Sequence, residues 1–200
     1  MLNDHTKFIN LALDEAKKAG QKNEVPIGAV VVDSNGSVTA AAHNQVITRA
    51  DVTAHAEILV LRSACAAANN YRLPGTTIFV TIEPCPMCMG AIIHARVERL
   101  VFGAFDPKWG AAGSIYNFAA DDRFNHQPEV ISGVCEGACR RLIKEFFRVK
   151  RVRVHPEIAS FGPGRRSRLF AILDVGLLRL RLQKGCGLDL NQNLLFMDGH

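Results

Sequence analysis

Residues 55–88 read HAEILVLRSACAAANNYRLPGTTIFVTIEPCPMC, and this segment decides our interpretation of the fold. Its first part carries apolar residues at helical spacing, which predicts a helix that Asp51 or Thr53 can cap and that ends near Asn69. The stretch from Thr76 to Ile82 is a short apolar run rich in β-branched residues, which is typical of a buried strand. The segment therefore predicts a helix that is followed by a strand.

The residues before this segment predict one more helix and a hairpin. Apolar residues recur at steps of three and four from about Asn3 to Ala19, where Gly20 stops the helix. The runs Val25–Val32 and Ser37–Ala42 flank the turn sequence of residues 33–36. Together the two runs predict a hairpin that opens the sheet.

The residues after it continue the alternation of strands and helices. Pro84 and Cys85 predict the start of a short helix that extends to about Ala95. A strand follows from Leu100 to Phe105, and a closing helix from about Val134 to Arg148. The order β-β-α-β-α-β predicts an α/β fold, in which helices cover both faces of one layered sheet.

Composition narrows the class of protein. With 200 residues and 48% hydrophobic content, the chain can bury one good core, and we expect one domain with an appendage. It has no run of about 18 apolar residues and no signal-like start, so we expect a soluble cytoplasmic protein that does not enter a membrane. Six unevenly spaced cysteines favour metal binding or core packing over a disulfide framework.

Charge is distributed unevenly along the chain. Residues 1–139 hold 11 Lys and Arg against 14 Asp and Glu, whereas residues 140–181 hold 12 against 3. A basic block of this kind attracts a polyanion, usually a nucleic acid, although a solvated basic tail has the same composition.

Four residues form the strongest chemical motif. His55, Cys85 and Cys88 offer three metal ligands, and a catalytic zinc site uses three protein ligands and leaves one tetrahedral position for water. His55 lies in the first turn of one predicted helix and Cys85 lies at the start of another. The positive ends of both helices can therefore face the metal, which favours thiolate over thiol. Glu57, two residues from His55, could carry protons. An isolated CxxC would more often be a redox or core pair, but here it accompanies the HxE and Pro84.

HxE with PCxxC is the signature of zinc-dependent nucleobase deaminases. The chain resembles the bacterial tRNA-specific adenosine deaminases, which belong to the cytidine/deoxycytidylate deaminase superfamily, from about Phe8 to Arg151. The blocks that carry the resemblance are VPIGAVVV from Val25, His43-Asn44, HAEI from His55, NYRL from Asn70, EPCPMCMGAIIHAR from Glu83, VFGAFDPKWGAAGS from Val101 and FFRVKR from Phe146.

The resemblance implies a layered α/β/α cytidine-deaminase-like fold with a central mixed sheet of about five strands. It implies one Zn²⁺ per subunit, a homodimer, and a wobble adenosine in a tRNA anticodon loop as the substrate. In this interpretation Asn44 hydrogen-bonds the target base, and Asp106, in the same loop as Lys108, accepts from a ribose hydroxyl. Val52 departs from the proline that is frequent in the family.

The resemblance also divides the chain, because the sequence after about Val154 matches nothing in the family. We therefore predict a zinc-dependent deaminase domain over residues 1–153 and a C-terminal extension without recognisable fold over residues 154–200.

Two other functions fit part of the pattern. A free-base or nucleoside deaminase acting on guanine, cytosine or cytidine shares the zinc blocks. A non-catalytic RNA-binding deaminase-like subunit would keep the zinc but lose the acid, and the presence of Glu57 argues against it. We expect His94 to lie outside the site, Cys135 and Cys139 to be packing residues, and Glu83 to have a structural or backbone-positioning role.

Overall fold

The computed structural model describes residues 2–154, with side chains described for residues 5–151. The chain divides into two units, and all contacts discussed below lie within the first, Met1–Val149. The predicted boundary at residues 153 and 154 falls at the end of the described residues. It stays a prediction, because the rest of the extension lies outside them.

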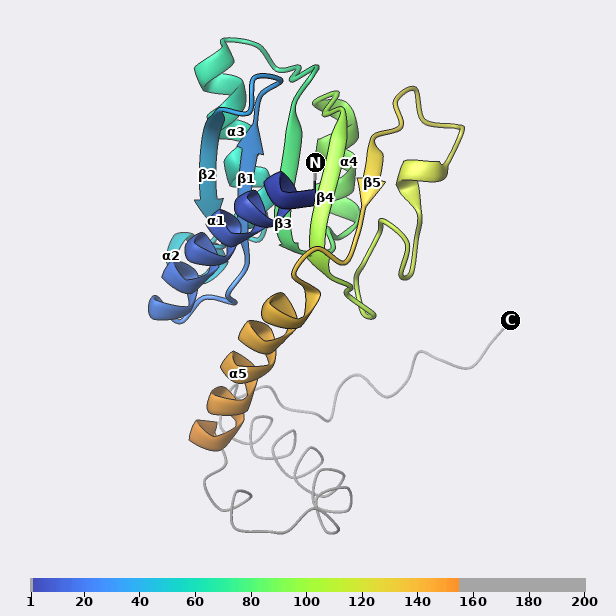
Figure 1. Ribbon diagram of the computed structural model, residues 1–200. Coiled ribbons are helices and arrows are strands. Elements are labelled where there is room, and N and C mark those ends of the chain that lie inside the picture. The colour runs from blue at the N-terminus through green and yellow to red at the C-terminus, as the bar shows by residue number, and fades with distance from the viewer. Residues whose placement is uncertain (1, 155–200) are drawn as a thin grey trace, which may run out of the picture. The chain divides into compact units, whose positions relative to one another are not determined.

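A mixed five-stranded sheet forms the centre of this unit (Figure 1). Its strands are β1 (Gly28–Val32), β2 (Val38–His43), β3 (Thr77–Ile82), β4 (Arg99–Ala104) and β5 (Glu129–Ile131). Their order across the sheet is β2-β1-β3-β4-β5. β1 is antiparallel to both of its neighbours, whereas β3, β4 and β5 are parallel to one another. The predicted mixed sheet of about five strands is therefore confirmed.

Helices cover both faces of the sheet, as the sequence predicted (Figure 1). The four long ones are α1 (Leu2–Gln21), α3 (Ala56–Ala68), α4 (Pro86–His94) and α5 (Glu136–Val154). Ala29 and Val31 of β1 join a core cluster with α3 and α4. Val30 and Val32 point the other way, into a cluster with α1 and the first turns of α5. The period-two alternation of a strand thus produces two cores.

Three short elements were not predicted. They are the helix α2 (Val46–Arg49), the 3₁₀ helix η1 (Phe118–Ala120) and the edge strand β5. Each has only three or four residues, too few for a periodic pattern to emerge from the sequence. β5 exists because its backbone pairs in register with the start of β4, where Arg99 lies beside Glu129.

The prediction that Asp51 or Thr53 caps α3 was wrong. α3 begins after His55, which is its N-cap residue. Asp51 instead accepts hydrogen bonds from the backbone N–H of Thr53 at 2.8 Å and from its hydroxyl at 2.7 Å. These bonds close a turn before the helix, and His55 is the last residue before α3 begins. No helix among residues 2–154 is long and apolar enough to cross a membrane.

α1 packs directly on the backbone of β1, and Gly28 makes this approach possible. A Cβ atom at residue 28 would overlap the carbonyl oxygen of Ala12 and lie 2.6 Å from the backbone nitrogen of Ala16. Both atoms belong to a helix that cannot move without leaving its core cluster. Only glycine therefore fits at the start of β1.

We expect Gly28→Ala to lower the free energy of unfolding by about 1–3 kcal/mol, because the added methyl forces α1 away from the sheet. Chemical denaturation measures this change. Gly20→Ala is the matched control, since a Cβ in that part of α1 would meet only Pro26 Cβ at an ordinary 3.6 Å. The control should leave stability unchanged or raise it by up to about 1 kcal/mol. Equal losses in both variants would contradict the explanation.

Candidate metal centre

The starts of two helices bring the three predicted ligands together. His55 is the N-cap residue of α3 and Cys85 is the N-cap residue of α4. Cys88 lies in the first turn of α4 and is fully buried. Neither N-cap side chain makes a capping hydrogen bond. The side chains are thus available to one centre, which the positive ends of both helices face.

The geometry of this group fits a zinc ion. His55 Nδ1 lies 3.7 Å from Cys85 Sγ and 3.5 Å from Cys88 Sγ. Zinc bonds of about 2.3 Å to sulfur and 2.0–2.1 Å to nitrogen, at a tetrahedral angle, place N and S about 3.6 Å apart. Within the part of the chain whose side chains are described, this is the one group of three or more candidate ligands. Glu57 is not a member of the group.

The pKa values of the two thiols also fit a site that binds a cation. Hydrogen bonds with Cys88 and with His55 lower the pKa of Cys85 to about 4. The hydrogen bond with Cys85 raises the pKa of Cys88, and burial raises it further. One thiolate therefore forms readily, but a second thiolate beside it needs a positive ion between the two sulfurs. Binding of that ion would release protons from the ligands.

Glu57 lies beside these ligands in an unusual environment. Its side chain is buried, and Oε2 has no hydrogen-bond partner. Burial raises the pKa of Glu57 to about 7. A carboxyl group with this pKa can both accept and donate a proton near neutral pH, which is the property of a general acid and base.

Asn44 follows the end of β2 and is buried. Its Nδ2 donates to Glu24 Oε2 at 3.5 Å, and Glu24 Oε1 accepts from the backbone N–H of Thr48 at 2.6 Å. Sequence analysis missed Glu24, which is fully buried. Its partners come 20 and 24 residues later in the chain, so no local pattern indicates the role.

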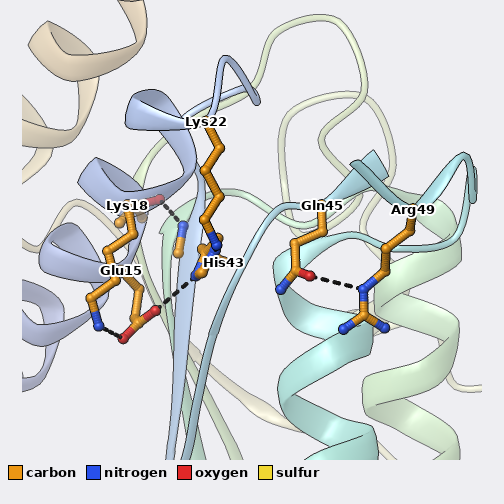
Figure 2. Close-up of polar contacts among 8 residues, drawn as sticks. Glu15, Lys18, Lys22, His43, Gln45 and Arg49 are labelled. Carbon is orange, nitrogen blue, oxygen red and sulfur yellow. Dashed lines mark hydrogen bonds and ion pairs between the residues drawn. The ribbon is translucent and has the colours of Figure 1, made fainter. Parts of the chain in front are cut away.

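A polar network fixes the strand end from which Asn44 emerges (Figure 2). His43 Nδ1 lies 2.9 Å from Glu15 Oε2 on α1, and Lys22 Nζ lies 3.3 Å from His43 Nε2. Glu15 also pairs with Lys18 at 2.5 Å. The network ties β2 to α1 one residue before Asn44.

Asp106 and Lys108 lie in the loop after β4. Asp106 is partly buried, and its Oδ1 accepts from the backbone N–H groups of Lys108 at 2.9 Å and Trp109 at 3.3 Å. The loop borders a largely apolar cavity of about 570 Å³, to which α5 contributes Arg140 and Lys144. The lining of this cavity includes Asp106 and Lys108 but none of the three metal-ligand candidates.

The other candidate residues lie outside the centre, as expected. His94 is an exposed residue at the end of α4. Cys139 is buried in the core cluster below α1, and Cys135 packs against the same cluster. A Cβ at Gly103 would overlap Cys139 Sγ, so the packing role of this cysteine is confirmed.

Known proteins are similar to this chain in sequence. Residues 2–104 match the family model of the cytidine and deoxycytidylate deaminase zinc-binding region. A tRNA-specific adenosine deaminase of Bacillus subtilis (strain 168) is 52% identical over 141 residues, which cover 70% of this chain and 87% of the relative. One of Agrobacterium fabrum (strain C58) is 48% identical over 149 residues, covering 74% and 97%.

Two solved structures are also similar to this chain. A structure from a study of A-to-I editing by tRNA:A34 deaminases is 48% identical, with a TM-score of 0.66, and covers 68% of this chain and 99% of its own. A guanine deaminase from Nitrosomonas europaea is 25% identical, with a TM-score of 0.60, and covers 70% of this chain and 83% of its own.

Fold and site together define a zinc-dependent deaminase. Within that class, the chain belongs to the family of the tRNA-specific adenosine deaminases.

We expect the purified protein to bind about one zinc ion per subunit, and Cys88→Ser to lower that content several-fold, because a hydroxyl is a poor zinc ligand. Elemental analysis of dialysed protein measures the metal. Cys65→Ser is the matched control, since this cysteine is a partly exposed residue of α3 outside the ligand group. Zinc retained at one equivalent in Cys88→Ser would contradict the assignment of the ligands.

Proposed function

We propose that this chain is a tRNA adenosine deaminase that converts the wobble adenosine of an anticodon loop to inosine. The observation that carries the proposal is the buried, unpartnered Glu57 Oε2 beside the group of His55, Cys85 and Cys88. A site of this composition hydrolyses an amino group from a nucleobase. The relatives that are about half identical to this chain are named as adenosine deaminases of tRNA, which supports the choice of substrate.

In this proposal His55, Cys85 and Cys88 would hold the zinc ion. A zinc ion bound there would supply a nucleophile at neutral pH by lowering the pKa of water. Glu57 Oε2 accepts a proton from the attacking water as a C–O bond forms at C6 of adenine. Glu57 donates this proton to the ring nitrogen beside C6, then takes the remaining proton of the new hydroxyl group at C6 and donates it to the amino group. The C–N bond breaks, ammonia leaves, and water and adenosine have become inosine and ammonia.

Three further side chains would recognise the substrate. We assign Asn44 to the target base, because its amide is buried beside Glu24 and held in one place by the end of β2. Asp106 would accept from a ribose hydroxyl, a contact that distinguishes RNA from DNA. Exposed Lys108, in the same loop, would lie near the phosphates. An anticodon loop suits such a site, because its unstacked base leaves the stack at lower cost than a base in a duplex.

We also propose that the chain acts in the cytoplasm as a homodimer whose two subunits both contact the substrate. Large apolar side chains on the surface support an interface, among them Val52 at 79% exposure and Ile47 at 64%. Both belong to the segment between β2 and α3, which leads to His55. Light scattering on the purified protein measures the oligomeric state, and a monomer at micromolar concentration would contradict this part of the proposal.

A guanine deaminase is the main competing function. The guanine deaminase from Nitrosomonas europaea is 25% identical to this chain, about half the identity of the tRNA-specific relatives. An assay that offers anticodon stem-loops with adenosine at the wobble position, beside guanine, cytosine and cytidine, separates the functions. We expect product only from the stem-loop with adenosine. Deamination of a free base alone would overturn the proposal.

We expect Glu57→Gln to reduce kcat for the stem-loop by at least about 100-fold, because glutamine keeps the size but cannot accept the proton. Zinc content and RNA affinity should remain. Chromatographic measurement of inosine, together with elemental analysis, tests both halves. Comparable activity in this variant would mean that another residue carries the protons.

The basic residues of α5 offer a second test. Lys144 and Arg148 are exposed residues of this helix, and Lys144 also borders the cavity beside the Asp106 loop. We expect Lys144→Gln with Arg148→Gln to weaken tRNA binding and to flatten its log-log salt dependence by roughly 0.7–0.9 per lost phosphate contact. Titrations at several salt concentrations measure the slope. Lys17→Gln, an exposed change on α1, is the control and should leave the slope unchanged.

A further inference from the structure

Glu83 is a buried acid that the proposed reaction does not use. It follows β3 and lies two residues before Cys85, with only 2% of its surface exposed. Oε1 accepts from the backbone N–H groups of Ala112 and Ser114, both at 2.9 Å. Oε2 accepts from the backbone N–H of Asp106 at 3.1 Å and from the Ser114 hydroxyl. All four donors come from the loop after β4.

Backbone hydrogen bonds next to the Glu83 side chain connect this segment to the end of β4 and to the same loop. The N–H of Glu83 donates to the carbonyl of Ala104 at 2.8 Å, and the carbonyl of Pro84 accepts from Ala111 at 2.9 Å. Gly110 lets the loop approach, because a Cβ there would overlap the Glu83 carboxylate and lie 2.6 Å from the Asp106 carbonyl oxygen. The loop of residues 105–114 is therefore wrapped around the two residues that precede Cys85.

We infer that Glu83 is a positioning residue, which fixes the loop of residues 105–114 relative to the metal centre. The inference rests on the proposed function, in which Asp106 and Lys108 of this loop contact RNA. Glu83 Oε1 and Oε2 each already accept two hydrogen bonds, so this carboxylate is occupied as an acceptor. Glu57 differs, because its Oε2 has no partner. The two acids thus have different roles: Glu57 moves protons, and Glu83 holds the loop of residues 105–114 in place.

Glu83→Gln separates these roles, because it keeps the shape of the side chain and exchanges one acceptor oxygen for an NH₂ group. If that group takes the place of Oε1, it faces the N–H groups of Ala112 and Ser114. If it takes the place of Oε2, it faces the N–H of Asp106. Either orientation leaves at least one buried donor opposed by another donor. Ser114→Ala is the milder variant, since it removes only the hydroxyl bond.

The experiment compares wild type, Glu83→Gln and Ser114→Ala by hydrogen exchange, zinc analysis and steady-state kinetics on the stem-loop with adenosine. In Glu83→Gln we expect the amides of Asp106, Ala112 and Ser114 to exchange about tenfold faster or more, because the loop opens locally. Zinc should stay at about one equivalent. KM should rise about tenfold while kcat changes less than about threefold, since uniform binding is lost and proton transfer is kept. Ser114→Ala should shift the same quantities less.

Three results would overturn the inference. They are unchanged exchange of the three amides in Glu83→Gln, a lower kcat at unchanged KM, and loss of zinc. A wild-type protein that does not deaminate the stem-loop would defeat the proposed function instead, and exchange would still test the hold of Glu83 on the loop. If Glu83→Gln does not fold, Gly110→Ala replaces it, because the added methyl would overlap the Glu83 carboxylate and separate it from the loop without changing Glu83 itself. It should give the same division between KM and kcat.

Discussion

The convergence of two helix starts on one point is the constraint on which the rest of the structure depends. α3 and α4 begin at His55 and Cys85, and these N-cap residues are themselves the ligand candidates. Thiolates and a cation are both stable there only if the helix ends, the sulfurs and the imidazole keep their places within a few tenths of an ångström. The sheet and its two cores supply that rigidity.

Strand direction places the remaining site residues beside this point. β2, β3 and β4 run in one direction, and β1 runs in the other. The carboxyl ends of the first three strands therefore lie on the same side of the sheet as the start of β1. Asn44 follows β2, Glu83 follows β3 and the loop with Asp106 follows β4, while Glu24 precedes β1. Loops at the carboxyl ends of parallel strands commonly carry ligand sites in open α/β sheets.

Sequence predicts what is local. HxE and PCxxC span only a few residues each, so their ligands and acid could be identified before the fold was known, and the long helices and strands follow from periodicity. The predicted cap of α3 was wrong because Asp51 accepts a hydrogen bond from its near neighbour Thr53 instead. β5 and the hydrogen bonds of Glu24 and Glu83 depend on partners about 20 to 31 residues away in the chain, which a pattern cannot reveal.

Three buried glutamates illustrate why sequence alone cannot assign their roles. Burying a carboxylate costs free energy unless the group is hydrogen-bonded. Buried acids in folded proteins therefore have hydrogen-bond partners, except where a function requires a free group. Glu24 is held by Thr48 and Asn44, and Glu83 by the loop of residues 105–114. Among the described side chains, Glu57 alone keeps a buried polar atom without a partner. The fold bears this cost at one place, beside His55, Cys85 and Cys88, where a carboxyl group that is free to exchange protons has a use.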